Sequence, residues 1–156
     1  MANESVVEIP ETMRAAVLRD PQVGLQVETI KTPRPGFGEV LVKVSGCGLC
    51  HSDLHVIGGA IAFPLPAVLG HEVAGQIVEV GPGNEFTGLE VGQQVAGGFL
   101  MPCGRCQHCN SGHDELCEPF FELNRLKGVL YDGKTRLESL DGEPIYMYSM
   151  GGLAEY

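Results

Sequence analysis

Short runs of alternating or continuous apolar residues, separated by glycine and proline, fill much of the first hundred positions of the chain. The clearest run spans residues 39–45, where Val40, Val42 and Val44 fall on one face with the two-residue period of a β-strand. Similar runs predict further strands at 13–18, 25–30, 72–80 and 91–98. Short strands punctuated in this way predict a mainly β fold, either a small barrel or a sandwich.

Three segments depart from this pattern. Residues 50–56 begin with polar side chains and predict one helical turn, capped by Ser52 or Asp53. Residues 129–148 predict a hairpin region with Asp-Gly pairs at its turns. The last residues, 151–156, predict the beginning of a further strand.

Charge and composition exclude several functions. The chain has 156 residues and a net charge of -10, which argues against binding to nucleic acid or to an anionic membrane surface, because both need basic protein surface. No apolar run approaches the roughly 20 residues of a membrane-spanning helix. No basic stretch leads into an apolar one near the N-terminus, so we expect no secretory signal and a cytoplasmic location.

Four of the six cysteines lie close together, at Cys103, Cys106, Cys109 and Cys117. Their spacing, C-x2-C-x2-C-x7-C, lets neighbouring thiolates reach one ion from a tight turn, and four thiolates make the closed tetrahedral site of structural zinc. Little else in this loop predicts a packed structure, so bound metal would supply folding energy there. The spacing therefore predicts a structural zinc site.

Other interpretations of these cysteines remain open. A disulfide framework is one, although clustered cysteines in a chain without a secretory signal more often bind metal. An iron–sulfur cluster, and hence an electron-transfer protein, is another. In ferredoxin motifs the fourth cysteine follows after three residues and precedes proline, whereas Cys117 follows a gap of seven and precedes Glu118. His108 and His113 lie in the same loop and are interpreted as solvated.

A second group of metal-binding residue types consists of Cys50 and, further along the chain, His71 and Glu72. One thiolate and one imidazole, with another protein ligand and one open position, would make a catalytic rather than a structural zinc site. Hydroxyl, carboxylate and imidazole side chains follow Cys50 directly, in the segment 52–55. The simpler alternative is that these polar residues cap a helical turn and face solvent.

These motifs resemble those of the medium-chain, zinc-dependent alcohol dehydrogenases. Segment 46–55, Gly-Cys-Gly-Leu-Cys-His-Ser-Asp-Leu-His, is similar to the family's first zinc-ligand motif, and segment 69–75, Leu-Gly-His-Glu-Val-Ala-Gly, to its G-H-E-x-x-G signature. Loop 103–117 resembles the family's structural-zinc lobe. Residues 151–156, Gly-Gly-Leu-Ala-Glu-Tyr, resemble a stretch near the end of its N-terminal catalytic part. The resemblance covers nearly the whole chain.

The resemblance implies a GroES-like, partly open β-barrel with short helices and a zinc-binding lobe. Residues 1–156 would form this catalytic domain, truncated at its C-terminal end. The lobe would occupy 101–119, and residues 120–150 look like an insertion. No G-x-G-x-x-G fingerprint follows a strand, so we expect the Rossmann domain that binds the dinucleotide to be absent from this chain.

The resemblance also implies a catalytic zinc in addition to the structural one. Cys50 and His71 would bind it, and Glu72 would lie beside it as an occasional ligand or as a neighbour that helps ligand exchange. Asp53 would fix the orientation of His71 by a hydrogen bond.

Three further residues receive roles from the resemblance. Ser52 would begin a proton relay that ends at His55, and His51 would face the pyrophosphate of the nicotinamide cofactor. Cys47 has no such role and is interpreted as a small buried residue. The substrate pocket would be lined partly by residues 57–63.

The implied reaction oxidises an alcohol to an aldehyde or ketone by hydride transfer to NAD or NADP, or runs in reverse, on a small-molecule substrate. The family's third catalytic ligand, usually a cysteine, and its cofactor domain would lie beyond residue 156. We therefore expect this chain alone to hold the structural zinc well, to hold the catalytic zinc poorly and to be inactive, and the full-length protein to be a homo-oligomer. The alternative is a non-catalytic zinc-binding interaction module of the same fold.

Overall fold

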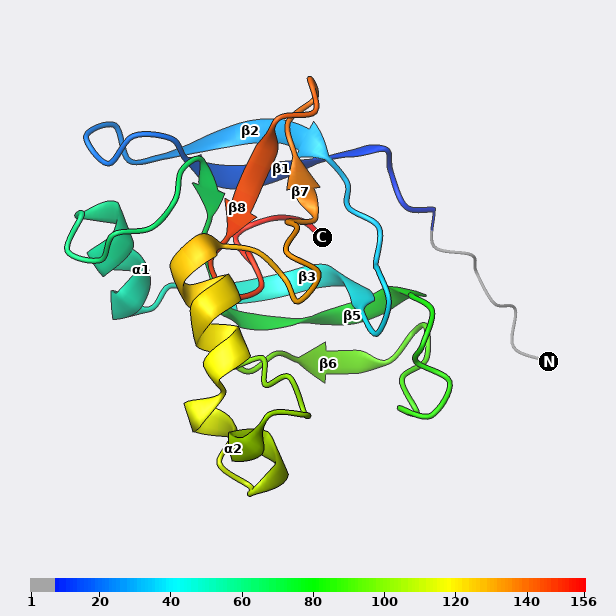
Figure 1. Ribbon diagram of the computed structural model, residues 1–156. Helices are drawn as coiled ribbons and strands as arrows, with labels where there is room; N and C mark the ends of the chain where they lie inside the picture. The colour runs from blue at the N-terminus through cyan, green and yellow to red at the C-terminus, as the bar shows by residue number, and fades with distance from the viewer. Residues whose placement is uncertain (1–7) are drawn as a thin grey trace.

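The computed structural model describes residues 8–156, and this part of the chain is built mainly from two β-sheets (Figure 1). The first sheet has the strand order β2-β1-β4-β8-β7. Its strands are β1 (Thr12–Leu18), β2 (Leu25–Lys31), β4 (Ala67–Val68), β7 (Leu137–Glu138) and β8 (Pro144–Met147). Neighbouring strands are antiparallel except for β4 and β8, which run parallel.

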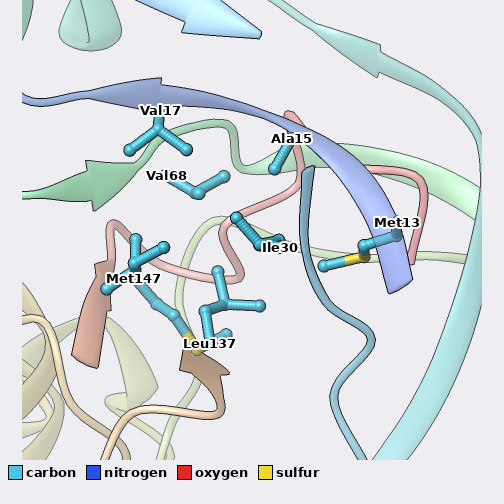
Figure 2. Packing of buried hydrophobic residues seen from close by; sticks show 8 residues of the cluster. Met13, Ala15, Val17, Ile30, Val68, Leu137 and Met147 are labelled. Atoms are coloured by element: carbon cyan, nitrogen blue, oxygen red, sulfur yellow. The ribbon is translucent and has the colours of Figure 1, made fainter. Parts of the chain in front are cut away.

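The main core lies against one face of this sheet, and β1 shows why its sequence forms a strand. Met13, Ala15 and Val17 are buried at alternate positions, as the two-residue period requires. Figure 2 shows these side chains meeting those of β2, β4, β7 and β8. Burial of each large apolar side chain stabilises the fold by about 1.5–3 kcal/mol. The cluster consists of Met13, Ala15, Val17, Ile30, Val68, Leu137, Ile145 and Met147.

The second sheet has the order β3-β5-β6, with all neighbours antiparallel. Its strands are β3 (Val40–Gly48), β5 (Glu72–Val80) and β6 (Gln94–Ala96). The strand predicted at residues 39–45 is confirmed as β3, but the face shared by the three valines is not the buried one. Leu41, placed opposite the three valines, is the buried residue, while Val40, Val42 and Val44 are half-buried. The register shifts after Leu41 and again after Val44, so the strand does not keep one face inward along its length.

The helices are short and lie at the ends of strands or in the cysteine-rich segment. They are α1 (His51–Ile57), α2 (Gln107–Asn110), the 3-10 helix η1 (Asp114–Leu116) and the π-helix η2 (Phe120–Arg125). The helical turn predicted near 50–56 is confirmed as α1. Within residues 8–156 no helix is long and apolar enough to cross a membrane.

Residues 120–150 form part of the first sheet. They supply β7 and β8, and Leu137, Ile145 and Tyr148 from this segment are buried. The predicted hairpin is present: β7 and β8 pair through the turn at Gly142, and a separate turn forms at Gly133. Whether the segment is an insertion relative to related proteins stays a prediction, but the core of this protein depends on it.

The C-terminal residues connect the two sheets but do not form the predicted strand. Ala154 makes only an isolated bridge to Ala15 of β1, and the Val44 N–H of β3 donates to the Glu155 carbonyl at 2.9 Å. Because these residues divide their backbone hydrogen bonds between β1 and β3, a continuous ladder with either strand does not develop.

Candidate functional site

The four clustered cysteines converge in the lobe around α2 and η1. The sulfur atoms of Cys103, Cys106, Cys109 and Cys117 all lie within 4.8 Å of one another, and those of Cys106 and Cys109 are 3.5 Å apart. At a zinc–sulfur distance of about 2.3 Å, the sulfurs of a tetrahedral site stand about 3.8 Å apart. All six cysteines of the chain are free thiols. The arrangement therefore fits a four-thiolate zinc ion.

Backbone amides already turn toward these sulfurs. The Cys106 N–H donates to the Cys103 sulfur and the Cys103 N–H donates to the Cys117 sulfur, each at 3.3 Å. Backbone hydrogen bonds, chiefly from Arg105, lower the pKa of the Cys103 thiol to about 7. N–H groups directed at sulfur favour the thiolate, which is the form that binds metal. His108 and His113 stay outside this cluster, 3.3 Å from Glu118 and 3.4 Å from Glu115 respectively.

The second cluster is assembled from two segments that are distant in sequence. Cys50 follows β3, while His71 and Glu72 lie at the start of β5, and one donor atom from each of the three residues falls within 4.8 Å of the others. The antiparallel pairing of β3 with β5 sets this distance, because it places Gly48 opposite Glu72. Glu72 lies so close over Gly48 that a side chain at that position would collide with its carboxylate.

Gly70 sets the backbone conformation of the segment that leads into His71. Its φ of +96° lies in the left-handed region, which a residue with a side chain rarely adopts. A Cβ atom there would stand 2.8 Å from the Cys47 sulfur and from the Leu153 backbone nitrogen. Only glycine allows the segment to pass between these two neighbours and present His71 to Cys50.

Asp53 links the two segments through its fully buried carboxylate. Oδ2 accepts from the Cys50 N–H at 3.0 Å and Oδ1 accepts from the Gly70 N–H at 3.1 Å. Oδ1 also lies 3.4 Å from Nδ1 of His71, which forms no regular hydrogen bond. The predicted cap is therefore wrong. Cys50 is the N-cap of α1, and Asp53 is the third residue of the helix, where its carboxylate accepts from the Cys50 N–H in a capping box and also from the Gly70 N–H.

Ser52 lies beside the cluster, in contact with His71, whereas the two histidines of α1 are exposed. The Ser52 hydroxyl is 3.2 Å from Nε2 of His71 and is half-buried. His51 and His55 are exposed, and their ring centroids are 4.7 Å apart. Across the described residues Ser52 makes no hydrogen bond to His55, so the relay predicted between them stays a prediction. Cys47 is half-buried, and burial raises the pKa of its thiol.

An open pocket of about 640 Å³ leads to the cluster. The donor residues and Ser52 lie in it, and the rest of the wall is apolar: Val73, Ala74, Ala96, Gly97 and Phe99. Residues 57–63 do not line this pocket, and their part in a substrate pocket stays a prediction. The wall comes from β5, β6 and the residues after β6, because β6 pairs with β5 beside His71.

Sequence reasoning missed the aromatic side chains that surround His71. The Phe99 and Tyr148 rings lie 4.5 and 5.7 Å from the His71 ring, centroid to centroid. The Arg125 guanidinium stands over the Tyr148 ring at 4.5 Å. No local pattern points to these side chains, since they come from three separate segments. The nearest signal is the aromatic enrichment near 146–148.

The donor types of the second cluster also fit zinc. Cysteine, histidine and an acidic residue are its three usual protein ligands, and three of them leave a position open to water or substrate. The three donor residues line an open pocket, so such a position is accessible. The lobe offers four thiols and no open position, so the two clusters differ in chemistry as well as in place.

Comparison with known proteins agrees with this geometry. The family described as "Alcohol dehydrogenase GroES-like domain" matches residues 36–156. An alcohol dehydrogenase of Geobacillus stearothermophilus is 44% identical over 109 residues, covering 68% of this chain and 32% of the relative. The structure of an alcohol dehydrogenase zinc-binding domain protein from Burkholderia ambifaria superposes with a TM-score of 0.79 at 38% identity, covering 92% of this chain and 38% of that one.

A third similar protein is an acetophenone reductase from Geotrichum candidum, whose structure was determined in complex with NAD. It is 40% identical with a TM-score of 0.65, and the match covers 71% of this chain and 33% of that one. The chain thus spans about a third of the length of each of these proteins. Residues 8–156 contain no dinucleotide-binding sheet of parallel strands. The fold, the clusters and the matches together show that the chain belongs to the medium-chain, zinc-dependent alcohol dehydrogenases and carries their GroES-like domain.

Proposed function

We propose that this chain is the substrate-binding and metal-binding part of an oxidoreductase that interconverts an alcohol and an aldehyde or ketone with NAD or NADP. The observation that carries the proposal is the convergence of Cys50, His71 and Glu72 in the lining of an open pocket, with Ser52 beside them. A non-catalytic zinc module needs the four-cysteine lobe but has no use for a second donor set facing a pocket.

The two donor sets have separate roles in this proposal. Cys103, Cys106, Cys109 and Cys117 would hold a structural zinc that stabilises the lobe, while Cys50, His71 and, in some states, Glu72 would hold a catalytic zinc. The catalytic ion, when bound, acts as a Lewis acid that lowers the pKa of an alcohol hydroxyl. The nicotinamide cofactor supplies the hydride chemistry.

The polar residues around the donors move the proton. The hydroxyl proton of the alcohol passes to the Ser52 oxygen as Ser52 gives up its own proton, which goes on to His55 and then to water. Asp53 orients His71 and keeps its ring directed at the cluster, because its buried carboxylate lies 3.4 Å from Nδ1. In ketone or aldehyde reduction the same groups return the proton.

The apolar wall binds the carbon skeleton of the substrate. Phe99, Val73 and Ala74 exclude water from one side of the pocket, which strengthens the polar interactions of the reacting group. We propose a small-molecule substrate with an apolar body, in agreement with the acetophenone named for one relative.

The cofactor would contact this chain at its edge. His51, which is exposed and next to Cys50, would face the cofactor pyrophosphate. The remaining cofactor contacts would come from a separate nucleotide-binding domain, since the relatives are about three times as long as the matched segment. Since the chain spans about a third of those proteins, the complete activity, the choice between NAD and NADP, and the homo-oligomeric state are proposals about the whole protein.

The test is NAD(P)-dependent oxidation of a panel of primary and secondary alcohols, with the 156-residue chain and with the complete product of its gene. The 156-residue chain alone should show no turnover, and in the complete protein the Cys50→Ser variant should lose it. Ser52→Ala should lower kcat by about 10²–10⁴-fold, which is the usual contribution of proton transfer by a positioned side chain. Cys47→Ser is the matched control, since Cys47 lies beside the cluster but offers it no ligand, and it should keep activity. Turnover that survives Cys50→Ser would refute the proposal.

A further inference from the structure

His51 and His55 form an exposed pair on the outer face of α1. They stand four positions apart, so one helical turn brings their side chains to the same face. The two rings are 4.7 Å apart, centroid to centroid, at an interplanar angle of 42°. Both side chains are exposed, and both lie outside the Cys50, His71 and Glu72 donor set.

This separation is close to that of two imidazoles on one metal ion. With metal–nitrogen bonds of about 2.1 Å, adjacent ligand positions place two imidazole ring centres roughly 4.5–5 Å apart. Two histidines at i and i+4 on a helix are a known arrangement for metal chelation. Imidazole nitrogen suits zinc, copper and nickel, with water completing the coordination.

We propose that His51 and His55 form a third metal site, which binds a divalent transition-metal ion from solvent. The ion is held by one nitrogen from each ring and by water, and it is distinct from the two cysteine-containing clusters. Asp53 and Cys50, the nearest potential ligands in sequence, are already engaged: the Asp53 carboxylate accepts from two backbone amides, and the Cys50 donor atom belongs to the other cluster. The net charge of -10 favours accumulation of cations near the chain.

This metal site goes beyond the proposed dehydrogenase function, and a metal ion bound there would block the roles proposed for both histidines in that function. His55 cannot accept a proton, and His51 cannot face a pyrophosphate, while their nitrogens coordinate an ion. An ion at this site therefore acts as an inhibitor of the complete enzyme, through α1 and without displacing zinc from either cluster.

The experiment is a titration of the zinc-saturated, tag-free chain with Ni²⁺, followed by calorimetry and absorption spectroscopy. Nickel is chosen because nickel bound by thiolate has strong ligand-to-metal charge-transfer absorption, whereas nickel bound by histidine has only weak bands. We expect one Ni²⁺ per chain without thiolate absorption and without release of zinc. His51→Ala and His55→Ala should each weaken Ni²⁺ binding at least about tenfold. A single imidazole lacks the second ligand that the neighbouring histidine supplies at high effective concentration.

The other exposed histidines provide the control. The double variant His108→Ala/His113→Ala removes both imidazoles of the lobe and should bind Ni²⁺ as the wild type does. The proposal is overturned if this control loses binding, if His51→Ala or His55→Ala keeps wild-type affinity, or if thiolate absorption appears. No alcohol or nicotinamide cofactor takes part, so failure of the dehydrogenase proposal would leave this result unchanged, and the reverse also holds.

Discussion

The two cysteine-containing clusters are built in opposite ways. The lobe takes all of its donors from residues 103–117, a segment with few buried side chains, and only Cys117 among the four is fully buried. The pocket cluster takes Cys50 from one segment and His71 from another, and it depends on the pairing of β3 with β5 and on the carboxylate of Asp53. We therefore expect the structure of the lobe to depend on bound metal, and the geometry of the pocket cluster to depend on the fold.

This difference predicts which substitutions each metal-binding cluster should withstand. A change in either β-sheet should leave the four thiols of the lobe together, because all four lie within residues 103–117. A change in the packing between β3, α1 and β5 should disturb the pocket cluster even where no donor is altered. The predictions below separate the two centres on this basis.

The largest effect is expected for Cys117→Ser. Loss of the buried ligand should remove one zinc per chain and unfold the lobe, because metal binding supplies its folding energy. Elemental analysis measures the zinc, and trypsin should then cleave at Arg105, between the first two ligands. Cys47→Ser, which removes a thiol outside both clusters, should change neither result. A protease-resistant lobe without zinc would contradict the metal dependence.

Gly70→Ala tests the dependence of the pocket cluster on the fold. Alanine is strained at a φ of +96°, and its Cβ would lie 2.8 Å from atoms of two neighbouring residues. We therefore expect a loss of about 2–4 kcal/mol in the free energy of unfolding. Gly92→Ala is a matched control, because its φ is +95° but no atom lies within 4 Å of the added Cβ. It should lose only about 1 kcal/mol or slightly more. Equal losses in urea denaturation would show that the close approach at Gly70 contributes nothing.

Asp53→Asn tests the link between the two segments of the pocket cluster. The amide keeps one acceptor oxygen but loses the second one and the charge, which should cost about 1–3 kcal/mol of stability. It should also weaken metal binding at Cys50 and His71 by about 10–100-fold while leaving the lobe unaffected. Asp141→Asn, in an exposed turn, is the control. A loss of lobe zinc in Asp53→Asn would mean that the centres are not independent.

The smallest effect concerns a surface contact outside both centres. The hydrogen bond from Arg136 lowers the pKa of Asp132, so its stabilising contribution is complete above the unfolded-state pKa of about 3.9 and is lost as the pH falls through the lower folded-state value. Because Asp132 is half exposed, the contribution should be under about 1 kcal/mol. Asp132→Asn should remove it at pH 7, and added salt should shrink the difference in urea midpoint. A difference in urea midpoint that grows with added salt would contradict an electrostatic contribution from the Asp132–Arg136 pair.

The sequence predicts the lobe more completely than it predicts the pocket. The spacing of Cys103, Cys106, Cys109 and Cys117 suffices because the ligands share one short loop, and the structure brings all four together. Strands β1, β2 and β5 were also predictable, since alternating or continuous apolar runs bounded by glycine and proline are local signals.

What the sequence does not predict is set by contacts between distant segments. The parallel pairing of β4 with β8 and the placement of Phe99 against His71 have no local period. The N-cap of α1 was predicted at the wrong residue because cysteine is not among the residue types that favour this position, although Asp53 does cap the helix from its third residue. The proton relay from Ser52 to His55 stays a prediction that only kinetics can test.

The central claim is that the chain carries two chemically different metal centres, and a Co²⁺ titration of the zinc-free protein tests it most directly. Tetrahedral cobalt reports the number of thiolates through its charge-transfer absorption. We predict two phases: a tight one with the intense absorption of four thiolates, lost in Cys117→Ser, and a weaker one with the absorption of one thiolate, lost in Cys50→Ser. A single phase that Cys50→Ser does not alter would contradict the second centre and, with it, the proposed dehydrogenase site.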